Sequence, residues 1–315
     1  MAPNLMQCGR RFSRVAVFAA VVLAALASHA ATFSLDSNQN LVGTTEAYVT
    51  RQGDTLLDIA RTYDLGYSQL IAANPGIDPW LPGANKRIAV SSLYLLPDGP
   101  RIGIIVSLSE QRLYYFPPGG QLVETFPIGI AVEANLTPIG STRVLAKDVR
   151  PSWYPPRSIR MERPDLPEVV PPGPDNPLGE YALRLGWPGY LIHGTNKPYG
   201  VGRHVSHGCI RLYPEDIARL FQEVKVGTQV RVIEEEVRLA WINNELYLAV
   251  FPSRRQVDDI GVNRPTTTEL PYHLVDQVVA AAGAAAIDRV DWHGVGQAGA
   301  KRNGIPVRIT RSALF

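Results

Sequence analysis

The segment from His193 to Arg211, HGTNKPYGVGRHVSHGCIR, concentrates side chains that could do covalent chemistry. It holds three of the six histidines of the chain and one of its two cysteines, Cys209. A thiol attacks a carbonyl as the thiolate, so Cys209 needs a neighbouring group that takes up its proton. His193, sixteen residues upstream, and His207, two residues before the cysteine, are the candidates. These residue types in this pattern predict an activated cysteine nucleophile.

The backbone around the cysteine could complete such a site. Alternating side chains of an extended chain put positions 207 and 209 on one face, and His193 could approach from an adjacent strand. Gly208 lets the backbone bend tightly beside the nucleophile. Such a bend can aim backbone N–H groups at one point, which is how an oxyanion is held in acyl transfer.

Three basic residues of the segment are candidates for supporting roles. Arg211, two residues beyond the cysteine, could hold a substrate carboxylate through its planar guanidinium. Arg203 and His204 lie on the Gly-rich stretch that leads to the cysteine and could contribute less directly.

Other interpretations of the same residues stay open. A zinc site would use the histidines and the cysteine as ligands, but the spacing H-x10-H-x2-H-x-C matches none of the common closed patterns. A buried, unreactive cysteine beside unrelated histidines is a second interpretation. A papain-like protease is disfavoured, because there the cysteine comes early and its histidine follows much later, which is the reverse of the order here.

Residues 1–30 have the order of a secretory signal. Three arginines come first, an apolar run from Val15 to Ala27 follows, and Ser28-His29-Ala30 supplies small residues where a signal peptidase would cut. Thirteen apolar residues are too few to span a bilayer comfortably, although an uncleaved anchor is the alternative. We therefore expect a protein that is exported by a cleavable signal.

Removal of this segment changes the charge and the cysteine content. The remainder holds 28 basic and 29 acidic residues, a formal charge of −1, because the first thirty residues carry three arginines and no acid. That balance favours neither a nucleic-acid partner nor an anionic-membrane partner. Cys8 also leaves, so Cys209 becomes the single cysteine of an exported chain, where cysteines are usually paired or missing. A solitary cysteine is either a buried bystander or a reactive thiol.

Residues 46–91 are predicted to form a small β-α-α-β unit. Positions 48–49 suit a short strand, and Asp54 can cap the helix that follows the turn. Ser68 is the candidate cap of a second helix. The segment 88–90 can form the returning strand.

The same stretch resembles the lysin motif. The resemblance rests on the start V-x-x-GDTL-x-x-IA, the later Ala-Asn-Pro and the Leu-Pro-Gly turn, and it covers nearly the whole segment. It implies binding to the N-acetylglucosamine-containing glycan of peptidoglycan. The alternative is a helical hairpin that only spaces the next domain from the membrane.

From residue 102 the pattern changes to the period-two alternation of short strands, which indicates a mainly β domain over 102–234. Short strands with turn signals at these intervals favour an antiparallel, β-sandwich-like or barrel-like sheet. One main helix interrupts them: Pro214 suits its first position, and Ile217 and Leu220 belong to its apolar stripe. The predicted strands are 102–108, 111–116, 122–130, 141–147, 181–185, 189–193, 228–233, 237–241 and 245–250.

A proline-rich passage, with nine prolines between residues 151 and 177, interrupts the predicted strands. So long a run without regular structure inside a compact domain is usually a functional loop or a linker. Strands resume after it and the reactive segment follows, so we expect a stiff flap over the site. Trp153 and Tyr154 are the expected substrate contacts on this flap.

The reactive segment resembles the active-site signature of the L,D-transpeptidase family, whose catalytic domain is of the YkuD type. That signature is a histidine, a spacer, then Ser/Thr-His-Gly-Cys and a polar residue two positions further on. The resemblance spans roughly 102–234. In order and spacing, the matching residues are His193, Ser206, His207, Gly208, Cys209 and Arg211.

The resemblance implies a role for each residue of the motif. Cys209 would be the nucleophile and His193 the general base. Gly208 and Cys209 would supply the oxyanion N–H groups, and His207 would shape the site. Some relatives carry Asn where this chain has Arg211, so the role of that residue is the least fixed.

The implied reaction is acyl transfer in two steps on a peptidoglycan stem peptide. The cysteine attacks the carbonyl between diaminopimelate at position three and D-Ala at position four, and D-Ala leaves. An amine then takes the acyl group. This amine is either diaminopimelate of a second stem, which gives a 3→3 cross-link, or a lysine of an outer-membrane lipoprotein. Ser206 and Arg211 would contact the substrate, and no metal or organic cofactor is implied.

Two rival functions stay open. Water in place of the amine would make a carboxypeptidase or an endopeptidase. A wall-binding protein with a degenerate site is the rival from another class, but an intact Ser-His-Gly-Cys with the upstream His193 argues against it.

Residues 235–315 are predicted to form a small α/β extension. An Ala-rich helix is expected over 274–287 and a final strand over 305–309. Asp291 and His293 are expected in a loop and not in a second site.

Overall fold

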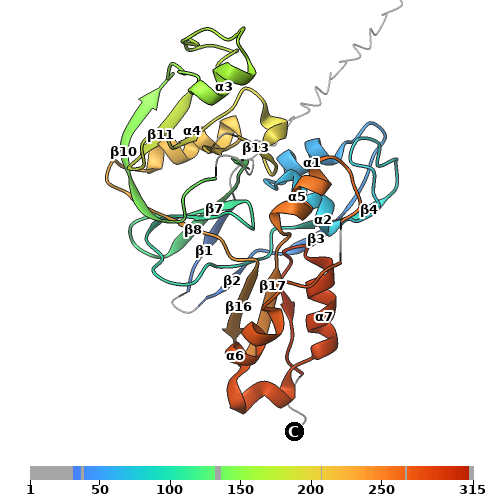
Figure 1. Ribbon diagram of the computed structural model, residues 1–315. Helices are drawn as coiled ribbons and strands as arrows, with labels where there is room; N and C mark the ends of the chain where they lie inside the picture. Colours follow the sequence, from blue (N-terminus) through green and yellow to red (C-terminus); the bar gives the residue numbers. More distant parts are fainter. Residues whose placement is uncertain (1–30, 37–38, 132–135, 207, 267, 312–315) are drawn as a thin grey trace, which may run out of the picture.

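The computed structural model describes residues 31–36, 39–131, 136–206, 208–266 and 268–311. The predicted signal at 1–30 lies outside these residues, and so does His207. Within the described ranges, no helix is both long enough and apolar enough to cross a membrane. Figure 1 shows a small helical unit in blue, a large curled sheet in green to yellow, and a C-terminal unit in orange to red that extends away from the sheet.

The first module has the predicted β-α-α-β order. Its strands β3 (Thr45–Val49) and β4 (Arg87–Ser91) pair antiparallel, and helices α1 (Leu56–Thr62) and α2 (Tyr67–Ala73) lie between them in sequence. The apolar faces of the helices and strands form a hydrophobic cluster of their own. Its buried members are Leu56, Ile59, Ala60, Leu65, Leu70, Ile88 and Val90.

Both predicted helix caps of this module are wrong. The N-cap of α1 is Thr55, whose hydroxyl accepts a backbone N–H of the first turn at 3.1 Å. Asp54 instead accepts the hydroxyl of Tyr48 at 2.8 Å. Ser68 lies inside α2, and its hydroxyl donates to the carbonyl of Gly202 at 2.6 Å. Asp54 and Ser68 thus hydrogen-bond to partners that the spacing of residues near a helix start does not reveal.

A nine-stranded sheet forms the body of the second module, and the mainly β fold is as predicted. The order in the sheet is β1-β8-β7-β6-β15-β10-β11-β12-β14. Two short strands, β9 (Ile130–Ala131) and β13 (His204–Ser206), pair with each other beside it. The nine strands are β1 (Ala31–Ser34), β6 (Gly103–Ser107), β7 (Arg112–Phe116), β8 (Leu122–Pro127), β10 (Gly140–Val149), β11 (Tyr181–Leu185), β12 (Leu191–His193), β14 (Ile210–Arg211) and β15 (Gln229–Ile233).

The sheet is mixed, whereas the sequence predicts an antiparallel one. Most neighbours run antiparallel, but β15 pairs parallel with β6, and β14 pairs parallel with β12. A parallel pair needs a long crossover, which the segment 194–209 provides between β12 and β14. Side chains alternate with a period of two in either direction, so the sequence pattern could not show which strands pair in parallel.

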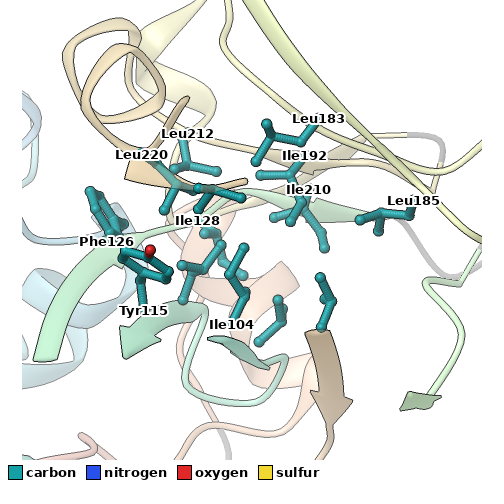
Figure 2. Close-up of a cluster of buried hydrophobic side chains, with 14 of the residues drawn as sticks. Ile104, Tyr115, Phe126, Ile128, Leu183, Leu185, Ile192, Ile210, Leu212 and Leu220 are labelled. Atoms are coloured by element: carbon teal, nitrogen blue, oxygen red, sulfur yellow. The ribbon is translucent and has the colours of Figure 1, made fainter. Parts of the chain in front are cut away.

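The core of this module lies between the curled sheet and helix α4 (Pro214–Glu223). Proline occupies the first turn of α4, as predicted from its missing N–H and its fixed φ. Ile217 and Leu220 are fully buried in the core. Figure 2 shows strand residues such as Ile192 and Ile210 converging with Leu220 on this cluster.

The proline-rich passage contains more regular structure than the sequence predicts. It carries helix α3 (Arg157–Glu162), and backbone hydrogen bonds of 2.9 and 2.8 Å pair Trp153 with Val170. Asn176 closes the passage, because its buried amide donates to the carbonyls of Pro151 at 2.8 Å and Val170 at 3.2 Å. The prolines stiffen the chain, and these hydrogen bonds fold it back on itself.

The C-terminal extension is a small α/β unit, as predicted. Its three strands form one sheet whose apolar residues pack with those of α6 and α7. His293 lies on α7 and not in the expected loop. The elements are β16 (Val237–Ile242), β17 (Glu245–Val250), α5 (Arg254–Gly261), α6 (Leu274–Ala286), α7 (Trp292–Lys301) and β18 (Val307–Arg308). A further pair, β2 (Leu41–Val42) and β5 (Tyr94–Leu95), flanks the first module in sequence.

The first module packs against the loop between β12 and β13. The N–H groups of Tyr67 and Ser68, at the start of α2, donate to the carbonyls of Val201 at 3.3 Å and Gly202 at 3.1 Å. The guanidinium of Arg203 lies 4.3 Å from the centre of the Tyr67 ring. This module is therefore docked on the second one and is not only tethered to it.

Side-chain contacts extend the same interface. Arg61 of α1 donates two hydrogen bonds, of 2.8 and 2.9 Å, to the carboxylate of Glu215 in α4. The hydroxyl of Tyr199 donates to Asp58 at 3.1 Å. These contacts are partly exposed, so each contributes about 1 kcal/mol or less to docking.

Gly202 is the tightest point of this interface. Its φ is 78°, and a Cβ at this position would lie 2.1 Å from the amide nitrogen of Tyr67. We expect Gly202→Ala to push the first module off the loop and to lower the free energy of unfolding by about 2–5 kcal/mol, since backbone strain and overpacking add. Urea or thermal denaturation measures this loss.

Gly227→Ala is the matched control for this variant. Gly227 has a φ of 91°, but nothing lies within 4 Å of the Cβ that alanine would add. It should cost only the backbone strain, about 1–2 kcal/mol. Equal losses for the two variants would contradict the steric role of Gly202.

Candidate active site

Two neighbouring strands bring Cys209 and His193 to the same part of the sheet. β12 ends at His193, and β14 begins at Ile210, directly after the cysteine. The strands pair with Ile192 opposite Ile210 and with His193 opposite Arg211. Both isoleucines belong to the core, so the alternation of side chains puts Cys209, His193 and Arg211 on the other face.

The His193 ring is buried, with 3% of the residue exposed, and its Nδ1 lies 2.6 Å from the carbonyl oxygen of Gly194. Burial lowers the pKa of this imidazole from 6.5 to about 3, and the charge of Arg211 acts in the same direction. Backbone hydrogen bonds with Gly194 and Leu178 oppose this shift. The imidazole is therefore neutral near pH 7 and able to accept a proton.

Cys209 is partly exposed, and its Sγ lies 3.6 Å from the carbonyl oxygen of Gly189. Burial raises the pKa of the thiol above its ordinary value of 9.0, while a backbone hydrogen bond with Leu191 and the charge of Arg211 lower it. The resting cysteine is thus a thiol and not a preformed thiolate. Attack on a carbonyl requires a base that removes the proton as the new bond forms, which is the role predicted for His193.

Arg211 acts electrostatically on both reactive groups, because its charge lowers the pKa of His193 and that of Cys209. Its backbone N–H and C=O pair with those of Gly129 at 2.9 and 2.8 Å, so the residue is held between β12 and the chain before β9. The buried Nε has no hydrogen-bond partner in the part of the chain that the structure describes. A guanidinium with an unused donor is suited to bind a substrate carboxylate.

Thr137, which no sequence motif indicates, fixes the peptide before Cys209. Its buried hydroxyl donates to the carbonyl of Gly208 at 2.9 Å. The C=O and N–H of a trans peptide point in opposite directions, so this hydrogen bond also aims the N–H of Cys209 away from Thr137. Gly208 has a φ of 109°, which side-chain-bearing residues rarely adopt. Thr137 lies 71 residues before Gly208, and no local pattern links the two.

The base of the proline-rich passage touches the reactive segment. The carbonyl oxygen of the Asn176 side chain accepts the N–H of Leu178 at 2.9 Å, and the backbone of Leu178 hydrogen-bonds the His193 ring. The amide of Asn196 donates to the carbonyl of Pro174 at 3.0 Å. The proline-rich passage is therefore attached directly beside the imidazole of His193. No sequence motif points to Asn176 or Leu178, apart from their place at the end of the proline-rich passage.

The remaining predicted contact residues stay predictions. Ser206 lies on β13, opposite Ala131 of β9, and His207 lies outside the described residues. Trp153 is half-buried, whereas Tyr154 exposes 67% of its surface. Both aromatic residues lie in the proline-rich passage.

Arg203 and His204 are used in packing between units. Arg203 lies over the ring of Tyr67, and Nδ1 of His204 lies 2.7 Å from a carboxylate oxygen of Asp258 in α5. Their contribution to the site is to hold the loop that leads to Cys209.

The zinc interpretation requires the cysteine and the histidines to converge. Among the residues that the structure describes, no three histidine, cysteine, aspartate or glutamate side chains are placed to hold a metal ion. His193 is instead engaged by backbone groups, and His204 by a carboxylate.

Residues 101–232 match the family model described as the L,D-transpeptidase catalytic domain, and residues 48–79 match that of the LysM domain. Three proteins of Escherichia coli K12 that are described as probable L,D-transpeptidases are similar to most of the chain. YcfS is 40% identical over 81% of this chain and 84% of its own length. YbiS is 37% identical over 93% of this chain and 96% of its own length. ErfK/SrfK is 37% identical over 80% of this chain and 81% of its own length.

The chain belongs to the L,D-transpeptidase family. Both resemblances predicted from the sequence, to the L,D-transpeptidase domain and to the lysin motif, are thereby confirmed. The predicted enzyme class, a transpeptidase that transfers an acyl group, is confirmed with the family.

The electrostatic role of Arg211 can be measured on the thiol. Alkylation of Cys209 should accelerate as the pH rises through the pKa of the thiol, which lies above 9.0. Arg211→Met removes the cation that lowers this pKa, so the midpoint of the pH profile should move further upward. The rate of reaction with iodoacetamide as a function of pH measures the shift.

Arg308→Met, on β18 of the C-terminal extension, is the control and should leave the profile unchanged. A midpoint that stays in place or falls in Arg211→Met would contradict the electrostatic link between the two side chains.

Proposed function

We propose that this protein is an exported peptidoglycan L,D-transpeptidase in which Cys209 is the nucleophile and His193 the general base. The observation that supports the proposal is the parallel pairing of β12 with β14, because a buried neutral imidazole ends one of these strands and a partly exposed thiol directly precedes the other. The similarity to proteins described as probable L,D-transpeptidases supports the substrate class. The apolar, small-residue pattern of residues 1–30 supports export to the periplasm.

The first half-reaction starts from two neutral groups. As Sγ of Cys209 attacks the carbonyl carbon that joins diaminopimelate to D-Ala, the thiol proton moves to His193. The hydrogen bonds of the ring with the backbone of Gly194 and Leu178 favour the charged imidazolium, since both act to raise its pKa. His193 then gives the proton to the nitrogen of D-Ala, which leaves, and a thioester remains on Cys209.

The negative charge on the carbonyl oxygen needs donors during this attack. The N–H of Cys209 is directed by the hydrogen bond between Thr137 and the carbonyl of Gly208. A donor of this kind contributes about 10²–10³-fold in rate. Thr137 acts through the peptide that it holds, so it is a positioning residue.

The second half-reaction passes the acyl group from Cys209 to an amine. Diaminopimelate of another stem would give a 3→3 cross-link, and a lysine of an outer-membrane lipoprotein would give an attached lipoprotein. Arg211 supports the binding of stem peptides. Its Nε has no hydrogen-bond partner among the described residues, and a guanidinium of this kind can pair with a carboxylate of the stem. Water as the acceptor would give hydrolysis.

Loss of the nucleophile should abolish the thioester. With Cys209→Ala, we expect no mass increase after incubation with a tetrapeptide stem or a carbapenem, as read by intact-protein mass spectrometry. His193→Ala should slow acylation by about 10²–10⁴-fold, because the thiol proton has no acceptor. His273→Ala, an exposed histidine at the start of α6, should react at the wild-type rate.

An adduct that persists in Cys209→Ala would contradict the assignment of the nucleophile. In the wild-type reaction, the products identify the acceptor. A cross-linked dimer indicates diaminopimelate, a lipoprotein conjugate indicates lysine, and a free tripeptide indicates water.

The first module supports binding to the glycan strand of peptidoglycan. Its family match covers residues 48–79, and its loop after α2 presents Trp80 and Leu81, which expose 53% and 81% of their surfaces. The carboxylate of Asp78 accepts the N–H groups of both residues at 2.8 and 2.9 Å, which fixes the loop. Exposed aromatic and apolar side chains on a fixed loop are suited to pack against sugar rings.

Trp80→Ala should therefore reduce the fraction of the full-length protein that sediments with purified sacculi. The expected loss in affinity is about tenfold, because burial of an aromatic ring contributes one to a few kcal/mol. Trp292→Ala, an exposed tryptophan of α7 in the C-terminal extension, is the matched control. If both variants sediment like the wild type, this loop does not bind the glycan.

A further inference from the structure

A pair of carboxyl groups is buried where the first module meets α4. Asp64 follows α1 and is 4% exposed, and Asp216 lies in the first turn of α4 and is 1% exposed. Asp64 has a φ of 54°, in the left-handed region that few residues other than glycine adopt. Two like charges that are buried together need a cation or a shared proton.

The contacts of this pair leave several oxygens unused. The two carboxyl groups are in hydrogen-bonding contact with each other, and the guanidinium of the fully buried Arg112 donates to the backbone carbonyl of Asp64 at 3.0 Å. Oδ1 of Asp64 and both carboxyl oxygens of Asp216 meet no further donor among the described residues. The backbone nitrogen of Ala31 donates to Oδ2 of Asp64 at 2.9 Å.

The charges in this region do not balance. Asp64 and Asp216 can carry two negative charges, and Arg112 supplies one positive charge. Arg61 is paired with Glu215 at 2.8 Å and therefore adds no net charge. Burial is the main cause that raises the pKa of Asp64 to about 7 and that of Asp216 well above its ordinary value of 3.8. As long as the nitrogen of Ala31 is a neutral peptide amide, the Asp64–Asp216 pair therefore keeps a proton.

Ala31 is also the residue that follows the predicted signal-peptidase site. Hydrolysis of the bond between Ala30 and Ala31 consumes one water, leaves a carboxylate on Ala30 and releases the nitrogen of Ala31 as a primary amine. Such an α-amino group has a pKa of about 7.7–8.0 and is mostly protonated at neutral pH. We infer that the α-ammonium group of Ala31, released by this cleavage, binds in the buried Asp64–Asp216 site as its second cation.

The position of the Ala31 nitrogen suits this role. The nitrogen of Ala31 already lies at hydrogen-bonding distance from Asp64, and an ammonium adds two more N–H donors for the unpartnered oxygens. Two carboxylates then face two cations, and the pair no longer needs to hold a proton. A charge-assisted hydrogen bond is also stronger than that of the amide it replaces.

The site joins three parts of the protein. Ala31 begins β1, which pairs with β8 at the edge of the nine-stranded sheet and places Ala31 opposite Thr125. Asp64 belongs to the first module, and Asp216 belongs to α4 of the catalytic domain. Cleavage therefore creates the group that fastens the glycan-binding module to the catalytic domain, and the uncleaved precursor lacks it.

Two forms of the chain test this inference. One is the exported and processed chain, whose first residue is determined by mass spectrometry of the N-terminal peptide and should be Ala31. The other carries Gly-Ser before Ala31, so that position 31 has an amide and no ammonium. We expect the extended form to melt about 5 °C lower, because it loses one partner of a buried ion pair.

Substitution of one carboxyl group shows whether the lower melting temperature of the extended form comes from the Asp64–Asp216 site. In an Asp64→Asn background, the two forms should melt at the same temperature, because the ammonium has lost its partner. In an Asp36→Asn background, which removes an exposed carboxyl group close to β1, the difference should persist.

Chemical labelling gives a second readout that does not depend on stability. The α-amino group of Ala31 in the folded, processed chain should react with an N-hydroxysuccinimide ester at least about tenfold more slowly than in the urea-unfolded chain, because it is paired and buried. Asp64→Asn should remove this protection. Should that variant fail to fold, the comparison of folded with unfolded wild-type chain still decides.

Three outcomes overturn the inference: processing at another bond, equal melting temperatures of the two wild-type forms, or an α-amino group that is not protected in the folded chain. None of these measurements uses transpeptidase activity. Their failure would therefore leave the proposed catalysis by Cys209 untouched.

Discussion

The parallel pairing of β12 with β14 is the constraint on which the active site depends. It sets His193 opposite Arg211 and holds Cys209 at the entry to the neighbouring strand. The register itself is fixed by Ile192 and Ile210, which are buried in the core below. A slip by one residue would turn these isoleucines outward and the reactive side chains inward, so core packing protects the geometry of the chemistry.

The cost of burying charge sets the chemistry at both ionisable sites. At the candidate active site, burial lowers the pKa of His193 and raises that of Cys209, so burial favours the neutral form of both groups. The backbone and Arg211 provide fixed dipoles and a fixed charge around these two groups. At the interface between the first module and α4, burial raises the pKa of Asp64 and Asp216. The pair is therefore suited to bind a cation.

The loop between β12 and β13 links the two modules of the protein. Near its C-terminal end, at Gly202, the loop contacts the start of α2, and the chain then continues through β13 to Cys209. The Gly-rich composition of this loop, which the sequence suggested was an approach to the site, is explained by this close packing.

The family, the β-α-α-β module and most strand positions could be predicted from the sequence alone, and the reactive residues were predicted from the same motifs. Those features rest on contiguous motifs such as Ser-His-Gly-Cys and on a periodicity that each segment displays on its own. The folded structure was needed to establish the parallel strand pairs, the N-cap at Thr55, the helix inside the proline-rich passage, and the hydrogen bond from Thr137 to Gly208. It also decided that the nitrogen of Ala31 meets Asp64, 33 residues further on. Each of these features depends on which distant segment is brought near by folding. The residue pattern of a single segment does not contain that information.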